Sequence, residues 1–391
     1  MTSHSMTVIA SLSIVGSASA GVFVNGNLLV QRIGDGTTAL SSAAAAVAVQ
    51  EFTRTGGSAV QTITFPTTGS GPVTDSGSAT SNGYLNVYNG YVGVSGYNNA
   101  AGTASVASQN TKVGTVLNGD GTVASRNLFP TGGPNGTPPS PFSSNNFRSM
   151  IATGANTFYA TGTSSGSPNT GGAWYYDGSA FTQVSSTTTG QPTNLRNVEI
   201  YNNQLYVSSS TGTFIGISTI GTGLATTGNQ TATLQINMGA GASPYGFVMF
   251  DTNNDSVLDL AYVADDRTAA GGGLQKWTLS GGTWSSSWAL LVNAAGTLSA
   301  TAGTGFVGLR GLTGTWDAVN GAQLFATTTE TTNNRLISII DNGITPTSAT
   351  NLASAGANYV FRGVDVYDAI PAPGALALLG VAGLIGARRR R

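Results

Sequence analysis

The sequence predicts an all-β protein, a single β-propeller of six four-stranded blades. Three observations predict it. A hairpin-like unit recurs along the chain, each interval has room for two more strands, and a segment near the N-terminus completes the last unit. Four strands per repeat of this length is typical of propellers. Seven blades are an alternative, because either of the two 65-residue intervals has room for one more.

The clearest repeat is residues 195–207, LRNVEIYNNQLYV. Alternating apolar residues on both sides of an Asn-Asn turn indicate two short antiparallel strands. Less regular copies begin at positions 82, 147, 244 and 309. Further strands are expected within the intervals, at residues 173–176, 181–185, 214–219, 233–238 and 334–340.

The sixth copy is divided between the two ends of the chain. Residues 361–368, FRGVDVYD, supply its first strand, and residues 27–30, NLLV, supply its second. Closure by the N- and C-terminal strands would remove exposed sheet edges, which otherwise promote aggregation. The alanine-rich run at 43–49 is expected to be a loop leading into a strand, and the stretches at 67–81 and 131–146 are expected to be surface loops.

Residues 1–20 resemble a signal peptide. A short apolar run at 6–15 precedes the small-residue pattern Ala18-Ser19-Ala20, although the segment before it contains no lysine or arginine. The alternative is an apolar tail without a targeting role. Cleavage before Gly21 would leave residues 21–368 as an exported propeller domain.

Residues 369–391 predict a short C-terminal transmembrane helix. Positions 369–387 contain no charged side chain, and a helix of that length reaches about 28 Å, close to the thickness of the hydrocarbon core. Four arginines follow, and positive charge is retained on the cytoplasmic side. The propeller domain would then lie outside the cytoplasmic membrane. The arginines are Arg388, Arg389, Arg390 and Arg391.

This tail resembles the PEP-CTERM sorting signal of bacterial envelope proteins. The resemblance rests on Pro371-Ala372-Pro373, the Gly/Ala/Leu-rich segment and the terminal arginines; Ala372 stands where the family has Glu. It implies export, transient membrane anchoring and processing by an exosortase-like enzyme, in proteins associated with the envelope and its exopolysaccharide. The alternative is a tail anchor that is not processed.

Composition excludes several kinds of chemistry. The chain has no cysteine, and its only histidine is His4, inside the predicted signal peptide. Thiol nucleophiles, histidine general bases and cysteine or histidine metal sites are therefore not expected in the mature protein. Without the last four arginines, 11 basic residues face 16 acidic ones, a net charge of −5. A nucleic-acid partner is not expected from such a balance.

One loop predicts a calcium site. In DTNNDSVLD, residues 251–259, oxygen-bearing groups alternate in the way calcium loops require. The loop resembles those of FG-GAP-type propeller repeats and, more loosely, dockerin and EF-hand loops, but Ser256 replaces the usual Gly and Tyr262 replaces the final Glu. The alternative is an Asx-rich turn without metal. The candidate ligands are Asp251, Asn253, Asp255, the Val257 carbonyl and Asp259.

An arginine recurs at the second position of four predicted first strands. Because these strands would line the central channel, the arginines either form part of a cationic ring for an anionic ligand or tie neighbouring blades together through hydrogen bonds. Glu199 and Asp365 share the fifth position of their units. Strand alternation would direct them away from the arginines unless a bulge intervenes. The arginines are Arg148, Arg196, Arg310 and Arg362.

Two functions fit these observations. One is a non-enzymatic, surface-displayed propeller that binds matrix polysaccharide or an envelope protein. The other is a carbohydrate-active lyase or hydrolase that uses channel carboxylates or arginines. Carboxyl groups with shifted pKa values, converging in a channel pocket, would favour the enzyme.

Overall fold

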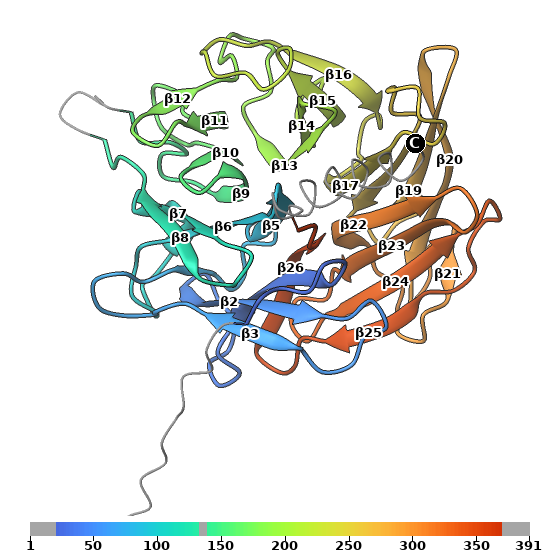
Figure 1. The fold of residues 1–391 in the computed structure, drawn as a ribbon, viewed down its shortest axis with the longest axis horizontal. Helices are drawn as coiled ribbons and strands as arrows, with labels where there is room; N and C mark the ends of the chain where they lie inside the picture. The colour runs from blue at the N-terminus through green and yellow to red at the C-terminus, as the bar shows by residue number, and fades with distance from the viewer. Residues whose placement is uncertain (1–20, 133–138, 370–391) are drawn as a thin grey trace, which may run out of the picture.

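The computed structural model describes residues 21–132 and 139–369, and these residues form a nearly all-β, propeller-like fold. They contain 26 strands and one 3-10 helix, η1 (Val106–Ser108). The sheets are arranged around a common centre (Figure 1). Within these two ranges, no helix combines the length and hydrophobicity that a membrane crossing requires. The predicted signal peptide (1–20) and nearly all of the predicted sorting tail (370–391) lie outside them.

Antiparallel units of four strands follow one another along the chain, each starting with the strand nearest the centre. The first complete units are β5 (Tyr84–Tyr88), β6 (Tyr91–Tyr97), β7 (Lys112–Leu117) and β8 (Val123–Leu128), then β9 (Phe147–Gly154), β10 (Thr157–Gly162), β11 (Gly172–Tyr176) and β12 (Phe181–Gln183). The next unit is β13 (Leu195–Tyr201), β14 (Gln204–Ser209), β15 (Gly216–Ile220) and β16 (Ala232–Asn237).

Two further units complete the series towards the C-terminal end. One contains β17 (Pro244–Phe250), β18 (Leu260–Asp265), β19 (Gly273–Ser280) and β20 (Thr283–Val292), extended by β21 (Leu298–Ser299). The other contains β22 (Leu309–Asp317), β23 (Gly321–Thr328), β24 (Arg335–Asp341) and β25 (Thr350–Ser354). The hairpins predicted from the repeats all lie within these strands.

The remaining unit joins the two ends of the chain. Its order is β26 (Tyr359–Val366), β1 (Leu28–Gly34), β2 (Ala44–Phe52) and β3 (Gln61–Thr64). β26 pairs antiparallel with β1, and Val366 lies opposite Leu28. The predicted pairing of residues 361–368 with 27–30 is therefore confirmed. β4 (Thr74–Ser76) links β2 to β6.

The alanine-rich run at 43–49 was wrongly predicted to be a loop. Most of it belongs to β2, which pairs with β1 on one side and with β3 and β4 on the other. Alanine has a low strand propensity, but pairing on both edges and burial override that preference. Ala44 and Ala48 are at most 5% exposed.

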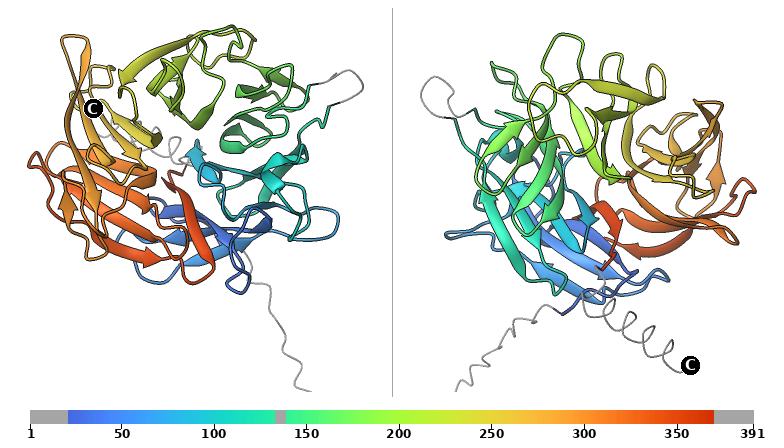
Figure 2. Two further views of the ribbon diagram at one scale, coloured as in Figure 1. Left: turned by 180° about the vertical axis from the view of Figure 1, so that it is seen from behind. Right: turned by 45° about the horizontal axis from the view of Figure 1, so that its top comes forward.

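The first strands of the units, here called the inner strands, pack against one another around the centre (Figure 2). In β17, β22 and β26 a glycine at the third position of the repeat allows this approach. A Cβ on Gly311 would lie 2.4 Å from the carbonyl oxygen of Arg362, and one on Gly363 would lie 2.6 Å from the Leu85 nitrogen. The inner strands are β5, β9, β13, β17, β22 and β26.

A register shift interrupts five of these strands. In each case it falls between the first and fourth positions, counted from the start of the sequence repeat. In β13 it falls between Leu195 and Val198, and in β22 between Leu309 and Leu312. β9, β17 and β26 have equivalent shifts. A bulge of this kind reverses the alternation of side chains. It allows the second and fifth residues of one strand to face the same channel, which regular alternation forbids.

Apolar side chains from neighbouring units fill the space between the sheets. Between the β17 and β22 units, for example, Leu274 and Tyr262 pack with Leu324 and Ile337, and all four are fully buried. This packing makes each unit depend on its neighbours, as in other repeat architectures. It also fixes the inner strands, and therefore the channel, in place.

Candidate acid–base site

A pocket of about 390 Å³ opens on the channel at the end where the inner strands finish. Four fifth-position residues line it: Glu199, Val248, Thr313 and Asp365. The strands β13, β17, β22 and β26 supply these side chains. The repeat therefore brings together, in one pocket, groups that are up to 166 positions apart in the sequence.

Asp365 is held by three hydrogen bonds. Its Oδ2 accepts from the Val87 backbone N–H at 2.7 Å, and its Oδ1 accepts from Thr313 Oγ1 at 2.7 Å and from the Val366 N–H at 2.8 Å. Three donors aimed at one carboxyl favour its ionised form. Asp365 is therefore fixed in orientation as an acceptor at the pocket.

Glu199 lies in a more apolar position, with 9% of its surface exposed. Its Oε1 accepts one hydrogen bond, from Asn197 Nδ2 at 2.9 Å. The chain of contacts continues inward: Ser149 Oγ donates to Asn197 Oδ1 at 2.8 Å, and Asn86 Nδ2 donates to Ser149 Oγ at 2.9 Å. Asn197, Ser149 and Asn86 were not singled out from the sequence; the signal was a small polar residue at the third position of two units.

The two carboxyl groups have different pKa shifts. Burial raises the pKa of Asp365 to about 6, because its hydrogen bonds only partly offset desolvation. Burial, and then repulsion from Asp365, raises the pKa of Glu199 well above its usual value. Burial and the charge of Asp365 thus favour the protonated form of Glu199, while the hydrogen bonds to Asp365 favour its ionised form. Two carboxyl groups whose surroundings separate their pKa values are the usual arrangement of a general acid and its partner.

A cation lies at the edge of the same pocket. Arg54 donates from Nε to the Gly26 carbonyl at 2.6 Å and from Nη1 to Thr315 Oγ1 at 3.3 Å. No carboxylate among residues 21–132 and 139–369 lies within ion-pair distance of it. Its guanidinium is therefore available to interact with oxygens of a bound molecule.

The four recurrent arginines lie at the opposite end of the inner strands and form what we call the arginine layer. Arg148, Arg196 and Arg362 each donate to the following unit, to the Leu195 carbonyl (3.1 Å), the Pro244 carbonyl (2.9 Å) and the Gly77 carbonyl (2.9 Å). Arg310 pairs with Asp266 at 3.3 Å. Each arginine thus links two units, while the group as a whole stays close enough for mutual repulsion.

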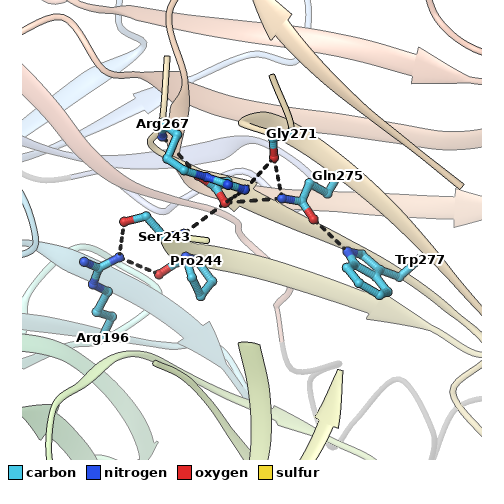
Figure 3. Close-up of polar contacts among 8 residues, drawn as sticks. Arg196, Ser243, Pro244, Arg267, Gly271, Gln275 and Trp277 are labelled. Carbon is cyan, nitrogen blue, oxygen red and sulfur yellow. Dashed lines mark hydrogen bonds and ion pairs between the residues drawn. The ribbon is translucent and has the colours of Figure 1, made fainter. Parts of the chain in front are cut away.

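Figure 3 shows one of these links. Arg196 donates from Nη1 to Ser243 Oγ as well as to the Pro244 carbonyl, both at 2.9 Å. The Ser243 N–H in turn donates to Asp265, a carboxylate already paired with Arg267 at 2.7 Å. Asp265 is therefore paired with Arg267, and the acceptors of Arg196 among the described residues, Ser243 Oγ and the Pro244 carbonyl, are neutral.

The predicted calcium loop connects β17 to β18, and its acidic groups accept hydrogen bonds from the loop's own N–H groups. Asp251 Oδ2 accepts from Ser256 at 2.7 Å, and Asp255 Oδ1 accepts from Val257 at 2.8 Å. Asn253 Oδ1 accepts from the Asp255 N–H at 3.0 Å. Asp259 is turned toward Thr252. Ser256 has φ 70°, the conformation for which Gly is usual at that position.

Within residues 21–132 and 139–369, no group of three or more acidic or histidine side chains is gathered for a metal. The loop thus has the hydrogen bonds of an Asx-type turn, and calcium binding stays a prediction. The sorting motif, Pro371, Ala372 and Pro373 with Arg388–Arg391, lies outside the described ranges.

A second cleft of about 390 Å³ lies between the β17 and β22 units. Of its three charged residues, Lys276 pairs with Asp341 at 2.7 Å, Tyr262 donates to the same carboxylate at 2.7 Å, and Asp259 accepts from Thr252. A carboxylate held in this way is a structural group.

No family model and no curated protein matches this chain. Among solved structures, it is similar to a candidate 6-phosphogluconolactonase from Bacteroides uniformis (14% identity, TM-score 0.41, 86% of this chain and 83% of that one). It is also similar to a Lactobacillus plantarum protein (10%, 0.45, 85% and 84%) and to a candidate glucose dehydrogenase from Thermus thermophilus (13%, 0.37, 83% and 99%). At these identities the likeness concerns the fold.

The hypothesis of a non-enzymatic propeller that binds polysaccharide or an envelope protein is corrected by the site itself, because two carboxyl groups with shifted pKa values line one channel pocket, the observation expected to favour an enzyme. It rested on the lack of histidine, cysteine and recognisable catalytic motifs. Carboxyl groups alone support acid–base chemistry, and a repeat places them together without any local motif.

Proposed function

We propose that this protein is an acid–base enzyme of the hydrolase or lyase class that acts on a polysaccharide, with Glu199 as the general acid and Asp365 as its ionised partner. The observation that carries the proposal is the meeting of these two carboxyl groups, with separated pKa values, in one channel pocket. Hydrolysis of glycosidic bonds uses such a pair of carboxyl groups.

The roles follow from the surroundings of each group. The protonated Glu199 can donate to a leaving-group oxygen, and burial favours that protonated form by raising the pKa. Asp365, held by three donors, can act as base or nucleophile. Arg54 would bind a hydroxyl or carboxylate of the sugar at the pocket edge.

Activity assays on a panel of neutral and uronic-acid polysaccharides test the proposal. Release of reducing ends identifies a hydrolase, and an ultraviolet-absorbing unsaturated product identifies a lyase. Glu199→Gln and Asp365→Asn should each lower kcat by about 10²- to 10⁴-fold, the usual contribution of a general acid or base. Glu330→Gln, which removes the carboxylate paired with Arg335 on the β22 unit, is the matched control. Equal activity of all three variants would exclude this site.

The architecture we propose is a six-bladed propeller. The support for it is the division of the described strands into six groups that each start with an inner strand, one of them assembled from both ends of the chain. An experimental structure of the protein would test the number of blades directly.

We also propose that the protein is exported and held, at least transiently, at the cell envelope by the tail beginning at Ala369, with processing by an exosortase-like enzyme. The support is the sequence of the tail and of residues 1–20. Fractionation of the native host, with mass spectrometry of the mature C-terminus, tests it. An intact Arg391 on surface-displayed protein would exclude processing.

A further inference from the structure

The arginine layer carries positive charge that the described residues do not neutralise. Of its four members, only Arg310 has a carboxylate within ion-pair distance in residues 21–132 and 139–369. The other three donate to carbonyl, hydroxyl or amide oxygens. Arg148 is 7% exposed and Arg362 is 2% exposed. Burying a guanidinium without a counter-charge is costly, so this arrangement favours an anion.

One other carboxyl group lies near the layer and neutralises it only in part. Asp75 is buried beside Arg362, and burial raises the pKa of Asp75 to about 7. Much of it is therefore protonated at neutral pH. Burial, and then repulsion from a neighbouring arginine, lowers the pKa of both Arg148 and Arg362 to about 10, which still leaves both cationic.

A buried tyrosine points into the same layer. Tyr84 is 1% exposed, and its hydroxyl has no hydrogen-bond partner among the described residues. It interacts electrostatically with Arg196, Arg310 and Arg362 and packs against Tyr245 with ring centroids 6.0 Å apart. The Nε–H groups of Arg148, Arg310 and Arg362 also lack a described partner. Several buried donors from different units therefore converge without an acceptor.

We propose that the arginine layer binds an oxyanion, a carboxylate, sulfate or phosphate group, whose oxygens accept from the Tyr84 hydroxyl and from the guanidinium N–H groups. Guanidinium donors bind such groups with short, charge-assisted hydrogen bonds. Arg196 is kept in place by stacking over the Tyr245 ring, 3.9 Å from its centroid. The site is thus preorganised by neutral contacts.

Access to the layer is separate from the acid–base pocket. Arg362 lines a cleft of about 250 Å³ together with Gly77, Thr332 and Asn358. β26 runs from this cleft to the other pocket, and three residues of strand, about 10 Å, separate Arg362 from Asp365. The oxyanion site therefore does not depend on the proposed enzymatic activity, and binding can be measured without turnover.

The test is calorimetric titration and thermal unfolding of the full chain with sodium sulfate, sodium phosphate and sodium glucuronate, each compared with sodium chloride at equal ionic strength. We expect saturable binding and a rise in Tm with at least one oxyanion, since a ligand of the native state stabilises it. Tyr84→Phe and Arg148→Gln should each weaken the affinity about tenfold or more. Arg126→Gln, which removes an arginine from the outer strand β8, should leave it unchanged.

The pattern among the probes identifies the source of the anion. Tighter binding of sulfate or phosphate indicates a free inorganic ion, and tighter binding of glucuronate indicates the acidic group of a larger sugar. Either result supports the site, provided that Tyr84→Phe binds the same anion more weakly than wild type does. Tyr84→Phe removes one oxygen and retains the ring, so it decides the matter if Arg148→Gln does not fold. Absence of an effect beyond that of chloride, or equal affinity in Tyr84→Phe and wild type, would overturn the proposal.

Discussion

Asn197 donates a 2.9 Å hydrogen bond from Nδ2 to Oε1 of Glu199, two residues further along the same inner strand. The regular alternation of a strand places such residues on one face. Asn197 is itself fixed by Ser149 of the preceding unit. The position of the proposed general acid is therefore determined by contact between units, and the following predictions use that relationship first.

Asn197→Ala should disturb catalysis through Glu199. The Asn197 amide stabilises the ionised form of Glu199. Without this donor the pKa of Glu199 should rise further, and the basic limb of the pH–rate profile should move to higher pH. Misplacement of the acid should lower kcat by about 10- to 100-fold with a smaller change in KM. A pH–rate profile and a melting curve separate this from a loss of fold. An unchanged basic limb would remove Asn197 from the positioning of Glu199.

Thr313→Val should move the acidic limb of the same profile. Activity requires the ionised Asp365, whose pKa of about 6 is held down by the hydroxyl of Thr313. Valine has a similar shape but no donor, so the pKa of Asp365 should rise and activity should be lost at a higher pH than in wild type. The loss of one charge-assisted hydrogen bond corresponds to about 1–3 kcal/mol. If the acidic limb does not move, another group controls it.

Asp75→Asn should flatten the dependence of stability on pH. The folded-state pKa of Asp75 is about 7 against 3.8 in the unfolded chain, so the native state binds more protons. Its contribution is fully present below pH 4 and is lost as pH rises through 7. In denaturant unfolding, the free energy of unfolding of wild type should fall by on the order of 2–4 kcal/mol between pH 4 and pH 7. The free energy of unfolding of Asp75→Asn should fall by less over the same range.

The matched control for that measurement, Asp177→Asn, should change the pH dependence of stability in the opposite direction. Asp177 is exposed, and backbone N–H groups of Ala180 and Ser179 lower its pKa in the folded state. Asp177→Asn should therefore cost stability at neutral pH and not in acid. Identical pH slopes for Asp75→Asn and wild type would mean that Asp75 is not the buried acid responsible.

Phe361→Ala should destabilise the unit that joins the ends of the chain. Phe361 is 2% exposed and contacts Phe52 edge-on, with ring centroids 5.7 Å apart. Removing a buried phenyl ring costs about 3–5 kcal/mol. Val319→Ala, at a site that is 90% exposed, should change stability by less than about 0.5 kcal/mol. Equal unfolding midpoints for the two variants would contradict the importance of this junction.

Calcium, if the loop at 251–259 takes it, should raise the melting temperature of wild type and not that of Asp255→Ala. Binding would require the Asp251 and Asp255 oxygens to exchange their backbone N–H donors for the cation. Calorimetric melting with calcium and with a chelator measures the difference. Identical melting temperatures of wild type in both buffers would support the alternative, an Asx-type turn that binds no calcium.

Much of the fold was predictable because the repeat is encoded locally. Alternating apolar residues and Asn turns located the inner hairpins, and the pairing of β26 with β1 followed from the missing half of one repeat. The loop expected at 43–49 failed because pairing on both edges of β2 overrides the propensity of alanine.

The site was only partly predictable. Glu199 and Asp365 occupy equivalent positions in the repeat, but nothing local to either residue shows that they line one pocket. The bulges in the inner strands, which change the alternation between the second and fifth positions, are not marked by any residue pattern in the repeat. The surroundings of the Tyr84 hydroxyl are made by side chains from four other units. Such relationships are three-dimensional and leave no motif.

The pairing of β1 with β26 has a consequence for the order in which this protein folds. Leu28 lies opposite Val366, so a contact at the start of the sheet needs a residue synthesised 338 positions later. Closing so large a loop costs conformational entropy, and proteins dominated by contacts between distant residues fold slowly. The ring therefore cannot close during synthesis of the earlier blades. Until β26 is synthesised, the edge of β1 that pairs with it is exposed.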